Sequence, residues 1–272
     1  MPNLAANLTL LFTEVPFLDR FAAARAAGFD AVECQFPYDH DAAEIRRRLD
    51  DHGLRMVLLN LPAGDWQAGD RGLACDPRRH REFRDSVHRA LDYASALGVP
   101  QLHCLAGVLP PGMDLRRARE TYLFNIEHAA SLCGPRGIRL LIEPINTLDM
   151  PGYFLSRTEQ ALDIIAACDS GNVFLQSDIY HMHSMGEDVP AMLRRALPHI
   201  GHVQLADAPG RHEPGTGVID YAGVFALLDE LGYQGWIGCE YHPLGDTVAG
   251  LEWRCGPSAT ALPAVACLNP AA

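Results

Sequence analysis

The feature that most constrains the fold is a regular alternation of short apolar runs with longer stretches of helical periodicity. Eight runs have the length and the β-branched content of strands, and seven stretches between them repeat apolar residues at helical spacing. The predicted strands cover Leu4–Leu8, Ala31–Gln35, Leu54–Asn60, Gln101–Leu105, Arg139–Glu143, Val173–Asp178, Ile200–Leu205 and Gly235–Tyr241. The predicted helices cover Phe17–Ala27, Asp41–His52, Arg78–Leu97, Leu115–Leu132, Thr158–Ala167, Val189–Leu197 and Tyr221–Leu231.

This alternation favours parallel strands joined by right-handed crossovers, and eight such units close into a barrel. An open doubly wound sheet is the alternative, but the first turn, Leu10–Thr13, lacks the glycine-rich phosphate motif of those folds. We therefore predict an α/β fold, a single (β/α)8 TIM barrel, over residues 1–254. Residues 255–272 are uncharged and rich in Ala and Pro, and we expect a peripheral or poorly ordered tail there.

Local signals mark the ends of several predicted helices. Ser156 followed by Glu159 has the spacing of a capping box, in which each side chain accepts a free backbone N–H. Glycines stand where a left-handed residue is expected to end a helix, at Gly28, Gly53, Gly98 and Gly232.

The composition excludes several classes of chemistry. All 22 basic residues are Arg, so mechanisms that need a lysine amine or a lysine-containing phosphate loop are excluded. The formal net charge of −12 argues against a nucleic-acid partner and against an anionic membrane surface. An anionic substrate would therefore need a local cation.

The eight cysteines are spread along the chain without a C-x-x-C pair, and no stretch has the features of a signal peptide. No apolar run is long enough to span a membrane. We therefore expect a cytoplasmic protein. The sequence leaves its oligomeric state open between a monomer and a homo-oligomer.

Each of the last four predicted strands leads to a residue that can bind a metal. These residues are Glu143, Asp178, Gln204 and Glu240. In a (β/α)8 barrel the carboxyl ends of the strands form the active site, so the four side chains should converge there. Three crowded carboxylates would repel one another unless a cation neutralised them. Oxygen ligands suit Mg²⁺ or Mn²⁺ rather than zinc, so we predict a site for one of these two metals.

Further polar residues lie in the loops beyond these strands. His181 comes three residues after Asp178, and Arg211 lies in a loop rich in Gly and Pro beyond the seventh strand. We expect both to contact a substrate, because Arg can bind a carboxylate through two hydrogen bonds. Asn7 and His103 are at or near strand ends as well and could line the floor of the site, although core packing is the favoured expectation for both.

The chain resembles the hydroxypyruvate isomerase family, within the xylose-isomerase-like barrels, over roughly residues 3–253. The motifs that carry this resemblance are Asn60-Leu61-Pro62-Ala63-Gly64-Asp65-Trp66, Leu141-Ile142-Glu143-Pro144-Ile145-Asn146, Asp178-Ile179-Tyr180-His181-Met182, Glu213-Pro214-Gly215-Thr216-Gly217 and Gly235-Trp236-Ile237-Gly238-Cys239-Glu240-Tyr241.

The resemblance implies that Glu143 and Glu240 transfer protons and also bind the metal, with Asp178 and Gln204 completing its coordination. The implied reaction interconverts hydroxypyruvate and 2-hydroxy-3-oxopropanoate, both small anionic acids. The sister family of 2-oxo-tetronate isomerases shares the opening Phe12–Phe17 and Gly28–Glu33, so 2-oxo-tetronate is the alternative substrate. The central motifs favour hydroxypyruvate.

Three alternatives compete with an isomerase that works by proton transfer. A hydride shift in similar barrels uses two metals and a lysine, and this chain has no lysine. Barrel endonucleases of the superfamily use a histidine-rich zinc site on DNA, which the carboxylate-rich strand ends and the acidic charge do not match. A barrel that binds a sugar acid without catalysis is the third alternative.

Overall fold

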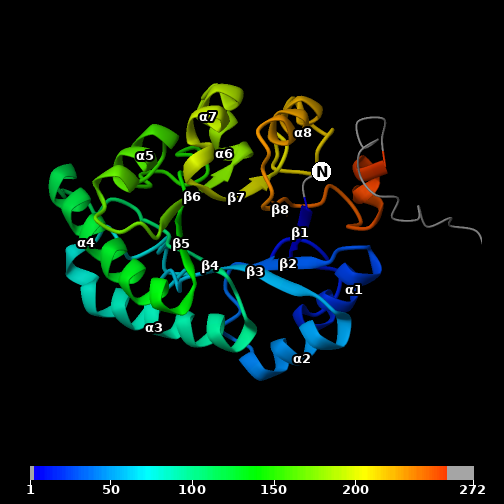
Figure 1. The fold of residues 1–272 in the computed structure, drawn as a ribbon, viewed down its shortest axis with the longest axis horizontal. Helices are drawn as coiled ribbons and strands as arrows, with labels where there is room; N and C mark the ends of the chain where they lie inside the picture. The colour runs from blue at the N-terminus through cyan, green and yellow to red at the C-terminus, as the bar shows by residue number, and fades with distance from the viewer. Residues whose placement is uncertain (1–2, 256–272) are drawn as a thin grey trace, which may run out of the picture.

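The computed structural model describes residues 3–255, whose eight parallel strands form a closed barrel. The strands follow the order of the chain, and β1 closes the ring by pairing with β8 (Figure 1). Their bounds are β1 Asn3–Asn7, β2 Ala31–Cys34, β3 Arg55–Asn60, β4 Gln101–His103, β5 Arg139–Ile142, β6 Val173–Asp178, β7 Ile200–Leu205 and β8 Trp236–Cys239. The predicted (β/α)8 barrel is therefore confirmed.

Helices surround the barrel on its outer side (Figure 1). The α-helices are α1 Arg20–Ala26, α2 Ala42–His52, α3 His80–Leu97, α4 Leu115–Cys133, α5 Thr158–Ala167, α6 Ile179–Ser184, α7 Val189–Ala196 and α8 Tyr221–Glu230. The 3₁₀ turns are η1 Phe17–Asp19, η2 Pro77–Arg79, η3 Gly134–Arg136, η4 Leu197–His199 and η5 Ala249–Cys255. All seven predicted helices are present, and η5 ends at the last described residue. The predicted tail lies outside the described residues apart from Cys255.

Two faces alternate along every strand and explain where polar residues can lie. In β5, Leu140 and Ile142 belong to the large core between the barrel and the helices, while Leu141 belongs to a smaller cluster. That smaller cluster holds the side chains that point into the barrel, among them Ala5, Ala31 and Leu141. Because successive strand residues face opposite sides, the next inward position after Leu141 is Glu143. Apolar residues thus fill one end of the barrel interior, and polar residues fill the carboxyl end.

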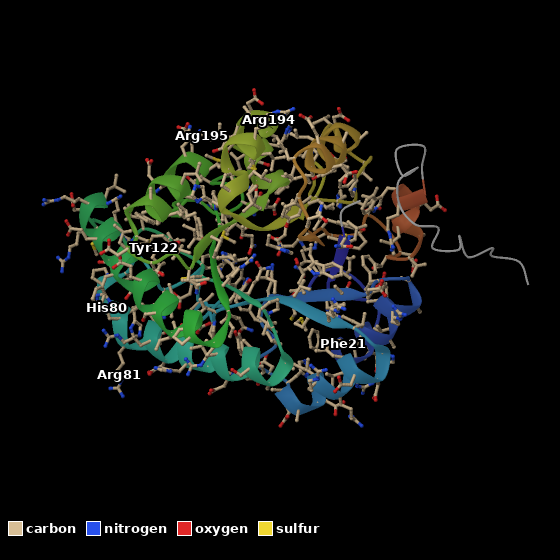
Figure 2. All side chains as sticks on the ribbon, in the orientation of Figure 1. Phe21, His80, Arg81, Tyr122, Arg194 and Arg195 are labelled. Atoms are coloured by element: carbon tan, nitrogen blue, oxygen red, sulfur yellow. The ribbon has the colours of Figure 1, made fainter. Side chains whose placement is uncertain are left out.

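The outer helices have the expected division of faces. Phe21 and Tyr122 are fully buried against the barrel, whereas Arg81, Arg194 and Arg195 point outward (Figure 2). Glycine ends two of these helices as predicted: Gly53 and Gly98 stand at the C-caps of α2 and α3 with φ of 62° and 69°.

One predicted cap is wrong. Helix α5 begins without a side-chain cap, and Ser156 and Glu159 do not form a capping box. Instead Glu187, from the turn before α7, accepts hydrogen bonds from the backbone N–H and the hydroxyl of Thr158. Glu159 forms an ion pair with Arg195. The N–H of Ser156, which Glu159 would accept in a capping box, donates instead to Oε1 of Gln160 at 3.1 Å.

Helix α6 was not predicted, and it places two site residues. It begins directly after β6, where Asp178 is its N-cap and accepts hydrogen bonds from the backbone N–H groups of Tyr180 and His181. His181 consequently lies on a helical turn over the barrel mouth rather than on an irregular loop.

Candidate active site

Four side chains from the last four strands converge at the mouth of the barrel. Glu143 follows β5, Asp178 ends β6, Gln204 lies in β7, and Glu240 follows β8. The backbone register pairs Asp178 with Gln204, and Gln204 with the residue two before Glu240. None of the four residues is more than 5% exposed. Three carboxyl groups are thus buried at one end of the barrel.

Glu143 has few partners. Its Oε2 lies 3.6 Å from the Nε2 atom of His103, and its Oε1 is buried without a hydrogen-bond partner. Burial, together with the charges of Glu240 and Asp178, raises the pKa of Glu143 well above its usual range. His103 is buried in the core, the favoured expectation, and also lies beside this carboxylate, and burial lowers its pKa to about 3. His103 is therefore neutral and supplies no positive charge to Glu143.

Asp178 uses its two oxygens differently. Oδ1 caps α6 through the N–H groups of Tyr180 and His181. Oδ2 has no hydrogen-bond partner and lies 3.7 Å from Nη2 of Arg211 and 3.8 Å from Nε2 of His181. Burial raises the pKa of Asp178, although Arg211 and the two backbone donors act in the opposite direction. The cap fixes the carboxylate so that its second oxygen faces the mouth.

Glu240 has three donors. Its Oε1 accepts hydrogen bonds from Gln35 at 2.7 Å and from Asn7 at 3.2 Å, and its Oε2 accepts one from Arg211 at 2.6 Å. Burial raises the pKa of Glu240 to about 7 even though the charge of Arg211 lowers it. A carboxyl group with this pKa can take up and release a proton near neutral pH.

The side chain of Gln204 is held on both sides. Its Oε1 accepts a hydrogen bond from Gln176 at 2.6 Å, and its Nε2 donates one to Glu33 at 2.7 Å. These two contacts fix which end of the amide is oxygen. A carbonyl oxygen has a second lone pair, so Oε1 can bind a cation while keeping Gln176 as a partner.

His181 has a defined tautomer. The amide oxygen of Asn146 accepts the backbone N–H groups of Leu148 and Asp149, so its Nδ2 faces Nδ1 of His181 at 2.7 Å and donates to it. The proton of the neutral ring is therefore on Nε2, which points toward Asp178. Burial and the charge of Arg211 lower the pKa of His181 well below its usual range. His181 is thus suited to donate a hydrogen bond at the mouth.

Arg211 is the cation of the site. Burial alone would lower its pKa, and the charges of Glu240, Asp178 and Glu143 outweigh burial and raise it. The residue has a left-handed backbone, with φ of 58°. Its loop is held by the buried carboxylate of Asp207, which accepts hydrogen bonds from the backbone N–H groups of residues 208, 215, 217 and 219. The loop thus presents Arg211 to the three carboxylates in a fixed way.

These residues fit a divalent cation. Ligand atoms of Glu143, Asp178 and His181 lie within 4.8 Å of one another. Buried oxygens without partners are costly, and two of them, Oε1 of Glu143 and Oδ2 of Asp178, belong to this group. A cation between them would remove that cost. The tautomer of His181 turns an N–H toward this group, so the oxygen atoms are the better ligands.

Several polar residues of the site were not assigned from the sequence. Glu33 is buried in β2, where it accepts hydrogen bonds from Asn7, His202 and Gln204. Asn7 is buried, as core packing requires, and it also lines the site, where it links Glu33 to Glu240. The signal for Glu33 was present in the sequence, because it lies two residues after Ala31 and therefore on the inward face of its strand.

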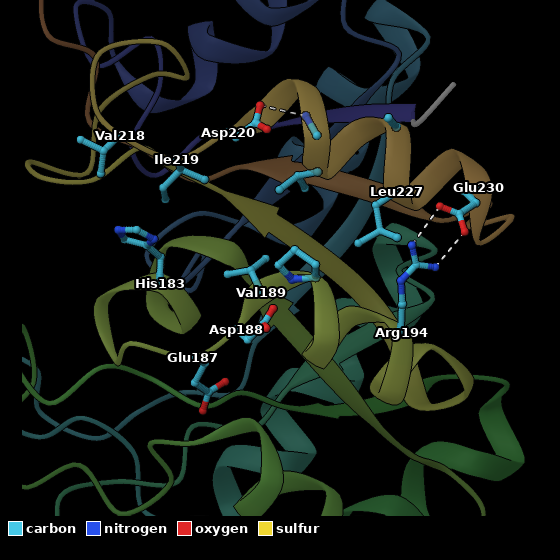
Figure 3. Close-up of a pocket in the computed structure, with 14 residues that line it drawn as sticks. His183, Glu187, Asp188, Val189, Arg194, Val218, Ile219, Asp220, Leu227 and Glu230 are labelled. Atoms are coloured by element: carbon cyan, nitrogen blue, oxygen red, sulfur yellow. Dashed lines mark hydrogen bonds and ion pairs between the residues drawn. The ribbon is translucent and has the colours of Figure 1, made fainter.

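A separate cavity lies on the outside of the barrel between α7 and α8 (Figure 3). Its volume is about 550 Å³, and none of the candidate site residues lines it. Its charged groups already have partners: Arg194 pairs with Glu230, and Asp220 caps α8. This cavity shows no feature of an active site.

Across residues 3–255, no helix has the length and apolar character needed to cross a membrane.

Comparison with known proteins agrees with this architecture. The family described as xylose isomerase-like TIM barrel matches residues 21–255. A structure titled AP endonuclease, family 2, from Brucella melitensis superposes with a TM-score of 0.92 at 45% identity, covering 94% of this chain and 98% of that one.

Two curated relatives match almost their whole length. The 2-oxo-tetronate isomerase of Cupriavidus necator is 49% identical over 253 residues, which is 93% of this chain and 97% of the relative. The hydroxypyruvate isomerase of Escherichia coli is 45% identical over 253 residues, or 93% and 98% of the two chains. The chain therefore belongs to the hydroxypyruvate isomerase family of xylose isomerase-like TIM barrels, and it is an isomerase.

Proposed function

We propose that this protein is a metal-dependent isomerase that interconverts hydroxypyruvate and 2-hydroxy-3-oxopropanoate by proton transfer. The observation that carries the proposal is the pair of buried glutamates, Glu143 after β5 and Glu240 after β8. These strands lie three apart around the ring, so the two carboxyl groups come from different walls of one mouth. Such an arrangement suits a substrate that lies between an acid and a base.

In this proposal the metal is Mg²⁺ or Mn²⁺, and its ligands are oxygens of Glu143, Asp178, Gln204 and Glu240. The partnerless oxygens of Glu143 and Asp178 support this ligand set. When bound, the metal stabilises the negative charge that develops on the substrate oxygens as the enediolate forms.

The two glutamates move the protons. One carboxylate removes a proton from C3, the carbon that bears the hydroxyl, and the other carboxyl group delivers a proton to C2. The hydroxyl proton passes from the oxygen on C3, which becomes the aldehyde oxygen, to the oxygen on C2, which becomes the new hydroxyl. The pKa of about 7 for Glu240 and the raised pKa of Glu143 support this role, because both groups can be protonated near neutral pH.

Arg211 and His181 bind the substrate in this scheme. Arg211 is the cation nearest the three carboxylates, and a protein of charge −12 needs such a cation to accept an anion. It pairs with Glu240 in the structure, so binding exchanges one carboxylate partner for that of the substrate. The N–H at Nε2 of His181 is placed to donate to a substrate oxygen.

The alternative substrate is 2-oxo-tetronate, which is longer than hydroxypyruvate by one carbon that bears a hydroxyl group. The 49% identity to the isomerase of Cupriavidus necator supports it, and the same two glutamates would serve. Hydrolysis of DNA is not supported, although a similar structure bears an endonuclease title. Among the residues that the structure describes, the candidate metal group contains a single histidine, and the overall charge would repel DNA.

Two measurements test the proposal. The first compares kcat/KM for hydroxypyruvate and for 2-oxo-tetronate with the same metal-loaded enzyme, and we expect hydroxypyruvate to be preferred. The second follows the reaction in D₂O, where a carboxyl group that exchanges with solvent introduces deuterium into the product. Full retention of the substrate hydrogen would indicate a hydride shift and contradict the two-glutamate scheme.

We also propose that residues 1–254 form the catalytic domain and that the segment 255–272 is peripheral to it. Deletion of residues 256–272 should then leave kcat/KM unchanged. A large loss of activity in a folded truncated protein would assign the segment a role in the site.

A further inference from the structure

One buried carboxylate near the site has no part in the proton transfer described above. Glu33 lies in β2 and is 1% exposed. Its Oε1 accepts hydrogen bonds from Asn7 at 2.9 Å and Gln204 at 2.7 Å, and its Oε2 accepts one from His202 at 2.6 Å. No arginine pairs with it among the ion pairs of the described residues. A buried acid held only by side-chain donors from β1 and β7 calls for an explanation.

The first consequence of Glu33 concerns the orientation of Gln204. Oε1 of Glu33 accepts a hydrogen bond from Nδ2 of Asn7, and the Gln204 group that faces the same oxygen is the NH₂, which donates a second one. The single oxygen of the Gln204 amide is thereby directed away from Glu33, toward Gln176 and the mouth. If the amide rotated by half a turn, oxygen would face oxygen. Glu33 thus selects the orientation that a metal ligand requires.

The second consequence concerns Glu240. The Nδ2 atom of Asn7 donates to Glu33 and also lies 3.2 Å from Oε1 of Glu240. The oxygen of the Asn7 amide accepts the backbone N–H of Thr9, so this amide too has one orientation. Glu33 therefore anchors the side chain that steadies one oxygen of Glu240.

The barrel makes room for this carboxylate. A Cβ atom on Gly238, in β8, would lie 2.3 Å from both oxygens of Glu33. Gly238 is also the backbone neighbour of Gln204 in the sheet. Any larger residue at position 238 would displace the carboxylate, so the niche depends on this glycine.

From these contacts we infer that Glu33 is a positioning residue that orients Gln204 directly, and Glu240 through Asn7, for binding of the divalent cation. Glu33 touches neither the substrate nor the cation in this scheme. The inference rests on the proposed metal dependence. Groups that orient metal ligands typically change metal affinity by about 10- to 100-fold when they are removed.

The test is a titration of metal-free protein with Mn²⁺ alone, followed by calorimetry, with circular dichroism to check the fold. Glu33→Gln keeps the shape but leaves one oxygen for three donors. We expect the Kd for Mn²⁺ to rise about 10- to 100-fold, and saturating Mn²⁺ to restore most of kcat. In a Gln204→Ala background the same substitution should have a smaller effect, because part of its action passes through Gln204.

A matched pair of glycine substitutions tests the same point without removing a charge. Gly238→Ala displaces Glu33 and should also weaken Mn²⁺ binding. Gly201→Ala is the control, since its Cβ atom would instead meet Leu141 at 2.6 Å, inside the same barrel. The control should leave the Kd for Mn²⁺ within about twofold of the wild type. This pair tests the positioning role of Glu33 even where Glu33→Gln does not fold.

Two outcomes overturn the inference at different levels. A wild-type protein that binds and requires Mn²⁺, with folded variants at Glu33 and Gly238 that bind it equally well, contradicts only the positioning role. A wild-type protein that neither binds nor requires a divalent metal contradicts the proposed function and this inference together.

Discussion

Glu143 and Glu240 are the same residue type at equivalent places on two strands, yet their surroundings differ. Glu240 receives hydrogen bonds from Gln35, Asn7 and Arg211. Glu143 has one oxygen with no partner, and its other oxygen faces the neutral ring of His103. Burial raises the pKa of both carboxyls, but the charge of Arg211 offsets this more strongly for Glu240.

The difference indicates that the two walls of the site, the β5 wall with Glu143 and the β8 wall with Glu240, are stabilised in different ways. The β8 wall is held by protein contacts alone. On the β5 wall one oxygen of Glu143 has no partner, and burial outweighs the charge of Arg211 and the hydrogen bond from Gln176, so the ionised form destabilises the fold until a cation or a proton arrives. The metal should therefore matter more to the Glu143 side, and experiments can separate the two walls.

Removal of the metal should have the largest effect. Chelation should reduce isomerase activity to background, and Mg²⁺ or Mn²⁺ should restore it, because the enediolate charge would otherwise meet three carboxylates. The measurement is turnover before and after exhaustive stripping and reloading. Full activity in stripped protein would refute the metal assignment. Asp178→Ala and Gln204→Ala should be rescued in part by excess metal.

Substitution of either glutamate by Gln should come next in size. Glu240→Gln and Glu143→Gln each keep one oxygen for the metal but remove the proton-transfer group, and general acid–base groups contribute about 10²- to 10⁴-fold. We expect kcat to fall by at least that factor in steady-state assays. The double variant should be little worse than either single one, because both residues serve one proton path. Near-normal turnover in either single variant would contradict the claim that both glutamates are needed for proton transfer.

Arg211→Ala should raise KM more than it lowers kcat. Loss of a hydrogen bond to a charged group costs about 1.5–3 kcal/mol, or roughly 10- to 150-fold in affinity. The control is Arg194→Ala, which removes an arginine that pairs with Glu230 on the outer surface and should leave KM unchanged. If His181→Ala raises KM in this way and Arg211→Ala does not, the substrate carboxylate is bound elsewhere.

The smallest effects concern stability without metal. Both substitutions replace a carboxyl group whose pKa is raised by burial, so both should raise the Tm of metal-free protein at neutral pH. The rise should be a few degrees for Glu143→Gln and smaller for Glu240→Gln, which also removes a hydrogen bond to Arg211. Thermal unfolding followed by circular dichroism checks both. Equal shifts in the same direction would show that the two walls do not differ in this respect.

The pH dependence of the same protein follows from the raised pKa values. Glu240 goes from a usual value of 4.5 to about 7 on folding, so the folded state holds its proton more tightly than the unfolded chain. The metal-free protein should therefore lose stability as pH rises from about 4.5 through 7. Metal binding competes with protons, so the gain in Tm on adding Mn²⁺ should grow over the same range. A gain that is independent of pH would contradict this.

The sequence predicted the architecture well because strand alternation is local information. Leu141 and Glu143 lie two residues apart, so both side chains face the barrel interior and the later one, Glu143, lies nearer the mouth. The capping box failed because Gln160 accepts the N–H of Ser156, and Glu187, a residue of another segment, accepts that of Thr158. Glu33 was missed because its partners, Gln204 and His202, are more than 165 residues away. Contacts of this kind depend on three-dimensional closure, which periodicity does not encode.

Closure of the barrel also determines when the site can exist during folding. The hydrogen bond from Asn7 to Glu240 spans 233 residues, and the one from Gln35 to Glu240 spans 205. Contacts this distant in sequence form late, because the intervening chain must be ordered before they add stability. A nascent chain that has not yet supplied β8 lacks Glu240, one of the two glutamates of the site. Catalytic activity should accordingly appear only with the joining of β1 to β8, which makes it a direct reporter of completed folding.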